Sequence, residues 1–227
     1  MNVRILSGIH GAQEAMGTTV IIDVLRAATV AAYLLDRGVE TIVPVATQEE
    51  AFAYKKSDPT LILVGEDKGM KISGFDIGNS PLEVKNAKNL AGKHVVQRSS
   101  TGTQGLVNVH QATTIIFGSF VTASAICNFI RRTKPDEVSL VSMGSDEDEL
   151  CAEFLRNQLL DKGTLKMSEI VERLEKSPDC QWFLDPNKAL FAREDFYLSL
   201  ELDTFAFFPL MQNDKIVRSR AEVSVSP

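Results

Sequence analysis

The sequence predicts an α/β fold with three layers, α/β/α, around a mostly parallel sheet of about six strands. Short apolar segments alternate along residues 18–160 with segments of helical periodicity. Polar and glycine-containing stretches follow most of the apolar segments, as loops do at the carboxyl ends of parallel strands. Helices between parallel strands cover both faces of a sheet, so we expect a single domain over residues 1–227.

Six short apolar segments are the expected strands. The first is rich in β-branched residues, which favour a pleated, buried conformation. None of the six is long enough to suggest a buried helix instead. In chain order they are residues 18–24, 41–45, 60–64, 94–97, 114–117 and 138–141.

A helix is expected after each of these strands. Gly38 ends the first helix, and the capping box Thr47-Gln48-Glu49-Glu50 opens the second. Ser80, Pro81 and Glu83 give the third an N-cap, a proline at its first position and a second capping box. The expected helices are residues 26–36, 47–56, 81–90, a short helix after 103, 121–132 and 146–160.

The carboxyl-terminal third is less regular. Residues 167–175 and 186–197 have helical periodicity. Residues 204–208 are apolar and aromatic, which favours a late strand. No internal repeat or linker divides the chain, which agrees with one domain.

Composition narrows the function. The chain has 227 residues, is 44% hydrophobic, and carries a formal net charge of −6. An acidic protein is a poor partner for nucleic acid or an anionic membrane, and no apolar run reaches membrane-spanning length. The first residues lack a signal-peptide pattern. An anionic substrate would therefore need local cations, a metal ion, or both.

Cysteine and histidine residues exclude several kinds of site. Cys127, Cys151 and Cys180 are an odd number without C-x-x-C spacing, which favours reduced thiols in the cytoplasm over disulfides or zinc. The three histidines lie outside any motif, which disfavours a histidine phosphatase or a zinc enzyme. The sequence contains no P-loop motif, which disfavours nucleotide hydrolysis. A homodimer is left open.

Residues suited to phosphate chemistry follow the expected strands. Asp23 and Arg26 follow the first strand, residues 65–80 follow the third, and residues 98–103 follow the fourth. Carboxylates suit a hard cation such as Mg²⁺, and basic side chains with glycine-flanked hydroxyl groups suit anionic oxygens. We expect these loops to converge at one crevice beyond the strands.

Several of these stretches resemble the 2-phosphosulfolactate phosphatase family, in order and spacing, over residues 18–160. The resemblance implies an α/β fold and magnesium-dependent removal of phosphate from 2-phosphosulfolactate, a step toward coenzyme M. The stretches are DVLRAAT (23–29), GEDKGMKISGFDIGNSPLE (65–83), SSTGTQGL (99–106), GSFVTASAI (118–126) and EDELCAE (147–153).

The chain departs from the family pattern in three places. The family's G-E-R-G-G is replaced by residues 65–69, Gly-Glu-Asp-Lys-Gly, so the positive charge moves to Lys68. Thr101 and Thr122 stand where the family usually has asparagine. The roles of those asparagines therefore do not carry over to this chain.

The resemblance and the residue types together give a set of candidate site residues. Asp23 and Arg26 are the expected catalytic pair. The expected magnesium ligands are Glu66, Asp76 and Asp148. The expected substrate-binding residues are Lys68, Lys71, Asn79, Ser99, Ser100, Thr101, Gly102 and Thr103, with residues 99–103 wrapping an anion and Gly102 allowing its close approach.

Each assignment has a structural alternative. Asp23 would cap the following helix, and Arg26 would pair with a surface carboxylate. Glu66 and Asp76 would be solvated loop charges, and Asp148 would complement the dipole of its helix. Residues 99–103 would form a simple strand-to-helix turn.

Three functions are compatible with the sequence. The first is a magnesium-dependent phosphatase of a small anionic phosphoester, with 2-phosphosulfolactate as the leading substrate. The second is a non-enzymatic binder of an anionic metabolite. The third is an enzyme of the same fold with another phosphorylated hydroxy acid, or another transfer reaction, as its chemistry.

Overall fold

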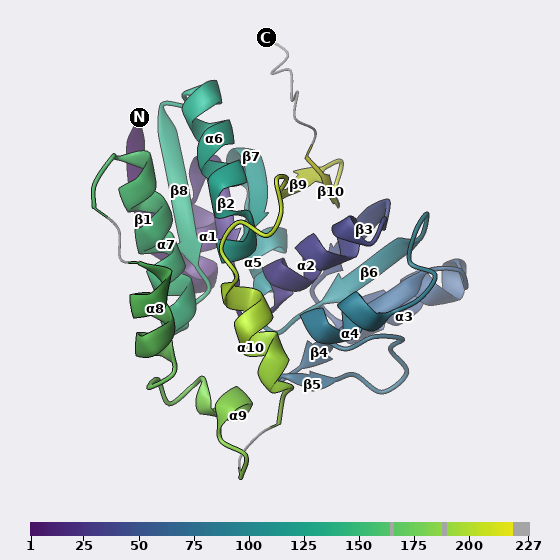
Figure 1. The fold of residues 1–227 in the computed structure, drawn as a ribbon. Helices are drawn as coiled ribbons and strands as arrows, with labels where there is room; N and C mark the ends of the chain where they lie inside the picture. The colour runs from purple at the N-terminus through teal and green to yellow at the C-terminus, as the bar shows by residue number, and fades with distance from the viewer. Residues whose placement is uncertain (164–165, 188–189, 220–227) are drawn as a thin grey trace.

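The structure is a computed structural model that describes residues 1–163, 166–187 and 190–219 (Figure 1). Within these residues ten strands form one sheet, in the order β1-β8-β2-β7-β9-β10-β3-β6-β4-β5. The strands are β1 (Asn2–Ser7), β2 (Met16–Ile22), β3 (Thr41–Val45), β4 (Ile62–Asp67), β5 (Met70–Lys71), β6 (His94–Arg98), β7 (Gln111–Gly118), β8 (Glu137–Ser142), β9 (Pro209–Gln212) and β10 (Lys215–Arg218).

The helices complete an α/β architecture, which confirms the predicted class. The sheet has ten strands rather than about six. The helices are α1 (Gly8–Glu14), α2 (Ala27–Asp36), α3 (Gln48–Ser57), α4 (Pro81–Asn86), α5 (Gly102–Val107), the 3₁₀ turn η1 (Phe120–Thr122), α6 (Ala123–Thr133), α7 (Asp146–Leu159), α8 (Met167–Leu174), α9 (Gln181–Leu184) and α10 (Arg193–Leu200).

The sheet consists of two parallel groups joined by a hairpin. β1, β8, β2 and β7 form one group, and β3, β6 and β4 form the other. The antiparallel hairpin β9–β10 touches β7 through the pair Ile116–Leu210 and β3 through the pair Ile42–Ile216. Three successive antiparallel pairings therefore separate the groups. As a result, the strands of one group run antiparallel to the strands of the other. Figure 1 shows α2 and α5 between the two groups.

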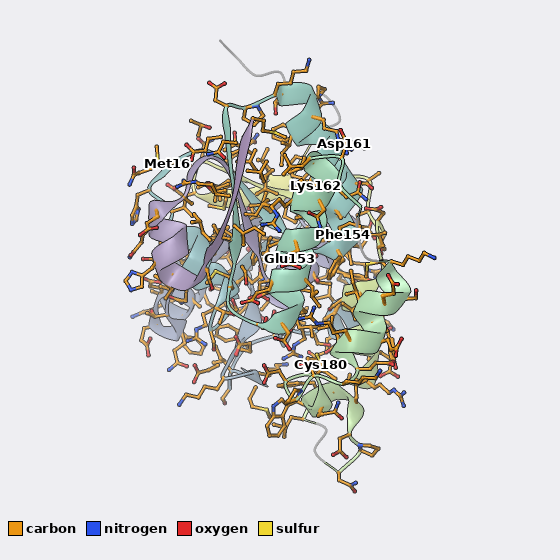
Figure 2. All side chains as sticks on the ribbon, turned by 90° about the vertical axis from the view of Figure 1, so that its left-hand side faces the viewer. Met16, Glu153, Phe154, Asp161, Lys162 and Cys180 are labelled. Carbon is orange, nitrogen blue, oxygen red and sulfur yellow. The ribbon has the colours of Figure 1, made fainter. Side chains whose placement is uncertain are left out.

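Alternating side chains of β2 supply two different cores. Ile21 belongs to the core beneath α1, α2 and α5, whereas Val20 and Ile22 belong to the core beneath α6 and α7. Strand side chains alternate between faces, so a central strand that is apolar on both faces is covered by helices on both. Figure 2 views the side that α7 covers and labels Glu153 and Phe154 on that helix.

Helix α2 links the two strand groups. Its residues from Ala27 to Leu35 are all buried. It packs against α4 near the second group, and against α5 and β7 near the first. An apolar helix buried on every side holds a fixed position, and here its amino-terminus stands at the carboxyl end of β2.

The six expected strands and the helices between them are present, and β3 matches its predicted range residue for residue. The capping box at Thr47 is confirmed, because Glu50 N–H donates to Thr47 Oγ1 and Thr47 N–H donates to Glu50 Oε2, both at 3.1 Å. At Ser80 only half of the box forms. Ser80 Oγ accepts from Glu83 N–H at 3.1 Å, but the Glu83 carboxylate accepts from Gly78 N–H instead.

Three predicted element ranges are wrong. The helix expected over 81–90 ends at Asn86, and Asn89 has a left-handed φ of 60° that a helix does not admit. Within the described part of 186–197, helix starts only at Arg193, because the N–H groups of Leu190 and Phe191 donate to the Trp182 carbonyl. Lys188 and Ala189 lie outside the described residues. Residues 204–208 are irregular, and the strand follows at β9.

Two observations concern the helices and the cysteines. Across the described ranges, no helix combines the length and apolar character needed to cross a membrane. Cys127, Cys151 and Cys180 are all free thiols in the interior.

Candidate active site

A cavity of about 230 Å³ opens where the loops after β2, β4, β6 and β8 meet the chain around α9. Loops at the carboxyl ends of strands from both groups therefore contribute to its lining. The lining residues are Asp23, Leu25, Arg26, Glu66, Gly69, Asn79, Ser100, Thr101, Ser145, Glu147, Asp179, Phe183 and Phe191.

Asp23 stands directly after β2, and its side chain is 3% exposed. Its Oδ1 accepts from Ala27 N–H at 2.7 Å, so it does cap α2. Its Oδ2 accepts from the Thr101 hydroxyl at 2.8 Å. Burial raises the pKa of Asp23, and the nearby charge of Glu66 raises it further. Asp23 is thus a helix cap and also a buried carboxylate with a raised pKa that lines the cavity.

Gly102 allows α5 to approach Asp23. A Cβ placed on Gly102 would lie 2.5 Å from Asp23 Oδ2 and 2.8 Å from Phe117 Cζ. No side chain fits there without moving the carboxylate or the ring. The glycine is therefore required for close approach within the protein.

Glu66, at the end of β4, organises the two loops beside it. Its carboxylate accepts hydrogen bonds from the N–H groups of Gly69 and Ser100 and from the Ser100 hydroxyl. The Ser100 hydroxyl also receives the N–H of Lys68 at 3.0 Å. A carboxylate of the chain itself thus occupies donors that we expected to serve a bound anion.

The expected anion cradle is largely engaged inside the protein. Ser99 N–H donates to Thr103 Oγ1, and Thr103 N–H donates to Ser99 Oγ, both at 2.9 Å. With Ser100 N–H on Glu66, three of the five backbone donors of residues 99–103 are used in forming the turn. Binding of a ligand by Thr101 and Gly102 stays a prediction.

Arg26 is 7% exposed and lies against the cavity wall. Nη1 donates to Asp195 Oδ2 at 3.1 Å, and Nη2 donates to the Gly69 carbonyl at 2.9 Å. The ring centroid of Phe191 lies 4.2 Å from Arg26 Cζ. The expected ion pair therefore exists, but with a buried carboxylate rather than a surface one.

The opposite side of the cavity is acidic. Glu147, in the first turn of α7, is 4% exposed; Ser145 Oγ donates to its Oε1 at 2.7 Å. Its Oε2 is buried and hydrogen-bonds to no other described residue. Burial raises the pKa of Glu147 to about 7, and the charge of Asp23 adds to the effect.

Asp148, the neighbour of Glu147 in α7, contacts the backbone of the loop after β2. Its Oδ1 accepts from Val24 N–H at 2.7 Å, which fixes the backbone next to Asp23. Burial raises the pKa of Asp148 well above its usual value, as do the charges of Asp23 and Glu147. Asp148 is not among the lining residues, whereas its neighbour Glu147 is.

A second cavity of about 250 Å³ adjoins the first and shares Arg26, Gly69, Asn79 and Phe191 with it. Asn79 is 6% exposed, and its Oδ1 has no hydrogen-bond partner among the described residues. Lys71 lines only the second cavity, and its Nζ donates to the Asp76 carbonyl at 2.8 Å.

Two candidate residues lie away from the first cavity. The Asp76 carboxylate is 44% exposed; it accepts from Leu63 N–H at 2.8 Å and pairs with Lys55 at 3.2 Å. The Lys68 side chain is exposed, and the residue has a left-handed φ of 49°. The structure does not bring either side chain to the cavity lining.

The cavity has oxygen atoms of the kind that Mg²⁺ binds. Among the described residues, no group of three or more His, Cys, Asp or Glu side chains is arranged to hold a metal. Mg²⁺ needs no such group, because it commonly binds one or two carboxylates and keeps several waters. Asp23 and Glu147 supply two carboxylates. Glu147 Oε2 and Asn79 Oδ1 accept no hydrogen bond from the described residues, and both are oxygen atoms that could serve as ligands of a hard cation.

Sequence reasoning missed Glu147, Asp195 and the two phenylalanines at the cavity. Glu147 is one of four consecutive acidic residues in the first turn of α7. Acidic residues in a first turn usually complement the helix dipole, so the sequence pattern does not single out Glu147. Asp195 and Phe191 lie in the irregular carboxyl-terminal third, where no local motif marks them.

Buried carboxylates and a buried arginine line one cavity at the ends of strands in an α/β fold, which is where such folds bind ligands and carry out catalysis. The family model described as 2-phosphosulpholactate phosphatase matches residues 5–214. The chain therefore belongs to the 2-phosphosulfolactate phosphatase family, and it is a phosphatase of a phosphate monoester.

Three relatives illustrate the similarity, each named a probable 2-phosphosulfolactate phosphatase. The one from Bacillus subtilis (strain 168) is 30% identical over 207 residues, 89% of this chain and 90% of the relative. The one from Carboxydothermus hydrogenoformans is 37% identical over 155 residues, 66% of this chain and 63% of the relative. The one from Caldicellulosiruptor saccharolyticus is 35% identical over 144 residues, 60% and 59% of the two chains.

Proposed function

We propose that the protein hydrolyses 2-phosphosulfolactate to sulfolactate and phosphate, with Mg²⁺ as cofactor. The observation that carries this proposal is the meeting of Arg26 with buried carboxylates in one cavity. A non-enzymatic anion binder gains nothing from burying Asp23 and Glu147 there, since both repel an anion. The family and the names of its members support the substrate.

Asp23 and Glu147 would hold the ion, with the Asn79 amide oxygen beside them. When bound, the ion neutralises phosphoryl oxygens and so favours in-line displacement at phosphorus. Its charge would also offset the effect of burial, which raises the pKa values of the two carboxylates. Glu66 takes the supporting role of fixing the loops on which Gly69 and Ser100 lie.

Arg26 would bind two phosphoryl oxygens through the guanidinium N–H groups that do not donate to Asp195 or to the Gly69 carbonyl. Guanidinium is planar and permanently charged, so it matches a tetrahedral anion and stabilises charge that moves to the leaving oxygen. Phe183 and Phe191 shield this side of the cavity from water, which strengthens the contact. Thr101 would orient the Asp23 carboxylate through its hydroxyl.

Phosphate release from a panel of phosphorylated hydroxy acids, with Mg²⁺ and with a chelator, tests the proposal. The expected result is release from 2-phosphosulfolactate that stops without the ion and returns when the ion is added back. Preference for another phosphorylated hydroxy acid would replace the substrate. Hydrolysis unaffected by the chelator would overturn the role of Mg²⁺.

The stereochemical outcome at phosphorus identifies the attacking group. Attack by the Asp23 carboxylate would give an acyl phosphate that water hydrolyses at phosphorus, so two in-line displacements would retain the configuration, whereas one direct attack by water inverts it. Hydrolysis of a substrate whose phosphoryl group is made chiral with oxygen isotopes therefore also tests the catalytic assignment of Asp23. Inversion would leave Asp23 the roles of ligand and base.

Two further points of the proposal concern the setting. A cytoplasmic location is supported by the free thiols of Cys127, Cys151 and Cys180, since the cytoplasm keeps thiols reduced. A place in coenzyme M synthesis would follow from the substrate. A homodimer stays a prediction, which sedimentation of the purified protein tests.

A further inference from the structure

Asp195 is a buried carboxylate whose oxygens are both engaged. It lies on α10 and is 1% exposed. Its Oδ2 accepts from Arg26, while its Oδ1 accepts from the Ser80 hydroxyl at 2.7 Å and from Leu82 N–H at 3.0 Å. A buried charge is tolerated only when it is paired and hydrogen-bonded, and Asp195 meets both conditions with groups that border the cavities.

The Arg26 guanidinium is held on its remaining sides as well. The Gly69 carbonyl accepts from Nη2, and the rings of Phe191 and Phe183 lie 4.2 Å and 5.6 Å from Cζ. Gly69 has a φ of +83°, and a Cβ there would lie 2.5 Å from the Phe191 ring. The ring, the glycine and the guanidinium are thus packed in one fixed arrangement.

We propose that Asp195 is a positioning residue that sets the orientation of Arg26 toward the phosphoryl group. The proposal rests on the proposed function, in which Arg26 binds two phosphoryl oxygens. Such a contact depends on the direction of the guanidinium fork, and Asp195 fixes one of its two terminal nitrogens. The same carboxylate holds Ser80 and the start of α4, so it aligns Arg26 with the wall that carries Asn79.

The first test compares Asp195→Asn with Glu194→Gln, which makes the same change of charge at the exposed neighbouring residue. The asparagine can still accept from Ser80 and Leu82, but its amide N–H would face Arg26 Nη1, donor against donor. We expect Asp195→Asn to weaken binding of inorganic phosphate, measured by calorimetry, and to lower kcat/KM, each by roughly tenfold to a hundredfold. Glu194→Gln is expected to change neither. Wild-type phosphate affinity in Asp195→Asn would overturn the proposal.

A double-mutant cycle separates positioning from simple stabilisation. If Asp195 acts through Arg26, adding Asp195→Asn to Arg26→Ala costs no further phosphate affinity or kcat/KM. Full additivity of the two losses would overturn the proposal. Ser80→Ala removes the hydroxyl that donates to Asp195 Oδ1. We expect this variant to have a lower melting temperature than the wild type and a smaller loss of phosphate affinity than Asp195→Asn. An equal loss of phosphate affinity in Ser80→Ala and Asp195→Asn would indicate a merely structural role and count against the proposal.

Folding of each variant is checked by circular dichroism. If Asp195→Asn is unfolded at the assay temperature, Asp195→Glu replaces it, because it keeps the charge and displaces it by one methylene. Its phosphate affinity is expected to lie between those of the wild type and Arg26→Ala, and wild-type affinity would overturn the proposal. Calorimetry with phosphate needs no turnover. A wild type that binds phosphate but hydrolyses no substrate would thus refute the proposed function while leaving the role of Asp195 testable.

Discussion

The Thr101 hydroxyl donates to Asp23 Oδ2 at 2.8 Å, and this contact joins the end of β2 to the loop after β6. The two strands belong to different parallel groups, which run in opposite senses along the sheet order. The Asp23 carboxylate is therefore oriented by a loop that belongs to the other half of the sheet. Changes at this junction should affect folding and catalysis together.

Gly102→Ala tests that coupling. The new Cβ would lie within 2.5 Å of Asp23 Oδ2, so either α5 or the carboxylate must move. We expect the free energy of unfolding to fall by about 1–3 kcal/mol and kcat to fall as well. Gly163→Ala is the control, because a Cβ there meets nothing within 4 Å. Urea denaturation and steady-state kinetics measure the two effects, and a loss of stability with normal kcat would mean that Asp23 is only a cap.

Arg26→Lys tests whether the guanidinium contributes to turnover. Lysine keeps the charge but cannot span two phosphoryl oxygens while also reaching Asp195 and Gly69. We expect kcat to fall about a hundredfold, a loss typical of a contact made mainly in the transition state. Arg131→Lys, at a partly exposed pair with Asp161, serves as the control. Near-normal turnover in Arg26→Lys would limit Arg26 to its ion pair.

The sequence predicted the fold better than the site, for reasons visible in particular residues. Each of the six predicted strands contains a short apolar run, and that local pattern identifies them. β1 escaped prediction because it is an edge strand whose Arg4 interrupts the apolar pattern. Residues 204–208 looked like a strand because Phe205, Phe207 and Phe208 are buried, yet they pack as an irregular segment. Phe205, for example, stacks edge-on against Tyr33.

The site depended on contacts that local patterns cannot report. Asp23, Arg26 and Asn79 were found because they lie in recognisable motifs at strand and helix ends. The partner of Arg26 lies 169 residues further along the chain, in a region without a motif. Asp76 shares the glycine loop with Asn79, but its carboxylate turns to the Leu63 backbone and Lys55. Proximity in sequence did not decide which of the two would face the cavity.

Glu147→Gln tests the acidic side through the pH dependence of stability. Burial raises the Glu147 pKa from 4.5 to about 7, so folding takes up a proton between these values. The stabilisation is complete below pH 4.5 and is lost as the pH rises through 7, a difference of roughly 3 kcal/mol in the metal-free protein. The glutamine variant is expected to lose less stability between pH 5 and pH 8 than the wild type.

Chemical denaturation at several pH values, without metal, measures this difference. Glu153→Gln on the exposed side of the same helix is the control, and its pH dependence should match the wild type. Identical slopes for Glu147→Gln and the wild type would show that Glu147 is ionised at no cost in the folded protein. Addition of Mg²⁺ should flatten the wild-type slope, because the ion favours the ionised carboxylate.

Calorimetric titration of Mg²⁺ into the metal-free protein decides which carboxylates hold the ion. Asp23 and Glu147 line the cavity, whereas Asp76 is bound to Lys55 outside it. We expect Asp23→Asn and Glu147→Gln each to weaken Mg²⁺ binding at least tenfold, since each removes one of two charged ligands. Asp76→Asn should bind Mg²⁺ normally while losing about 1 kcal/mol of stability with its hydrogen bonds. The opposite pattern, with Asp76→Asn weakened and Glu147→Gln normal, would restore the ligand set predicted from the sequence and place the ion at the glycine loop.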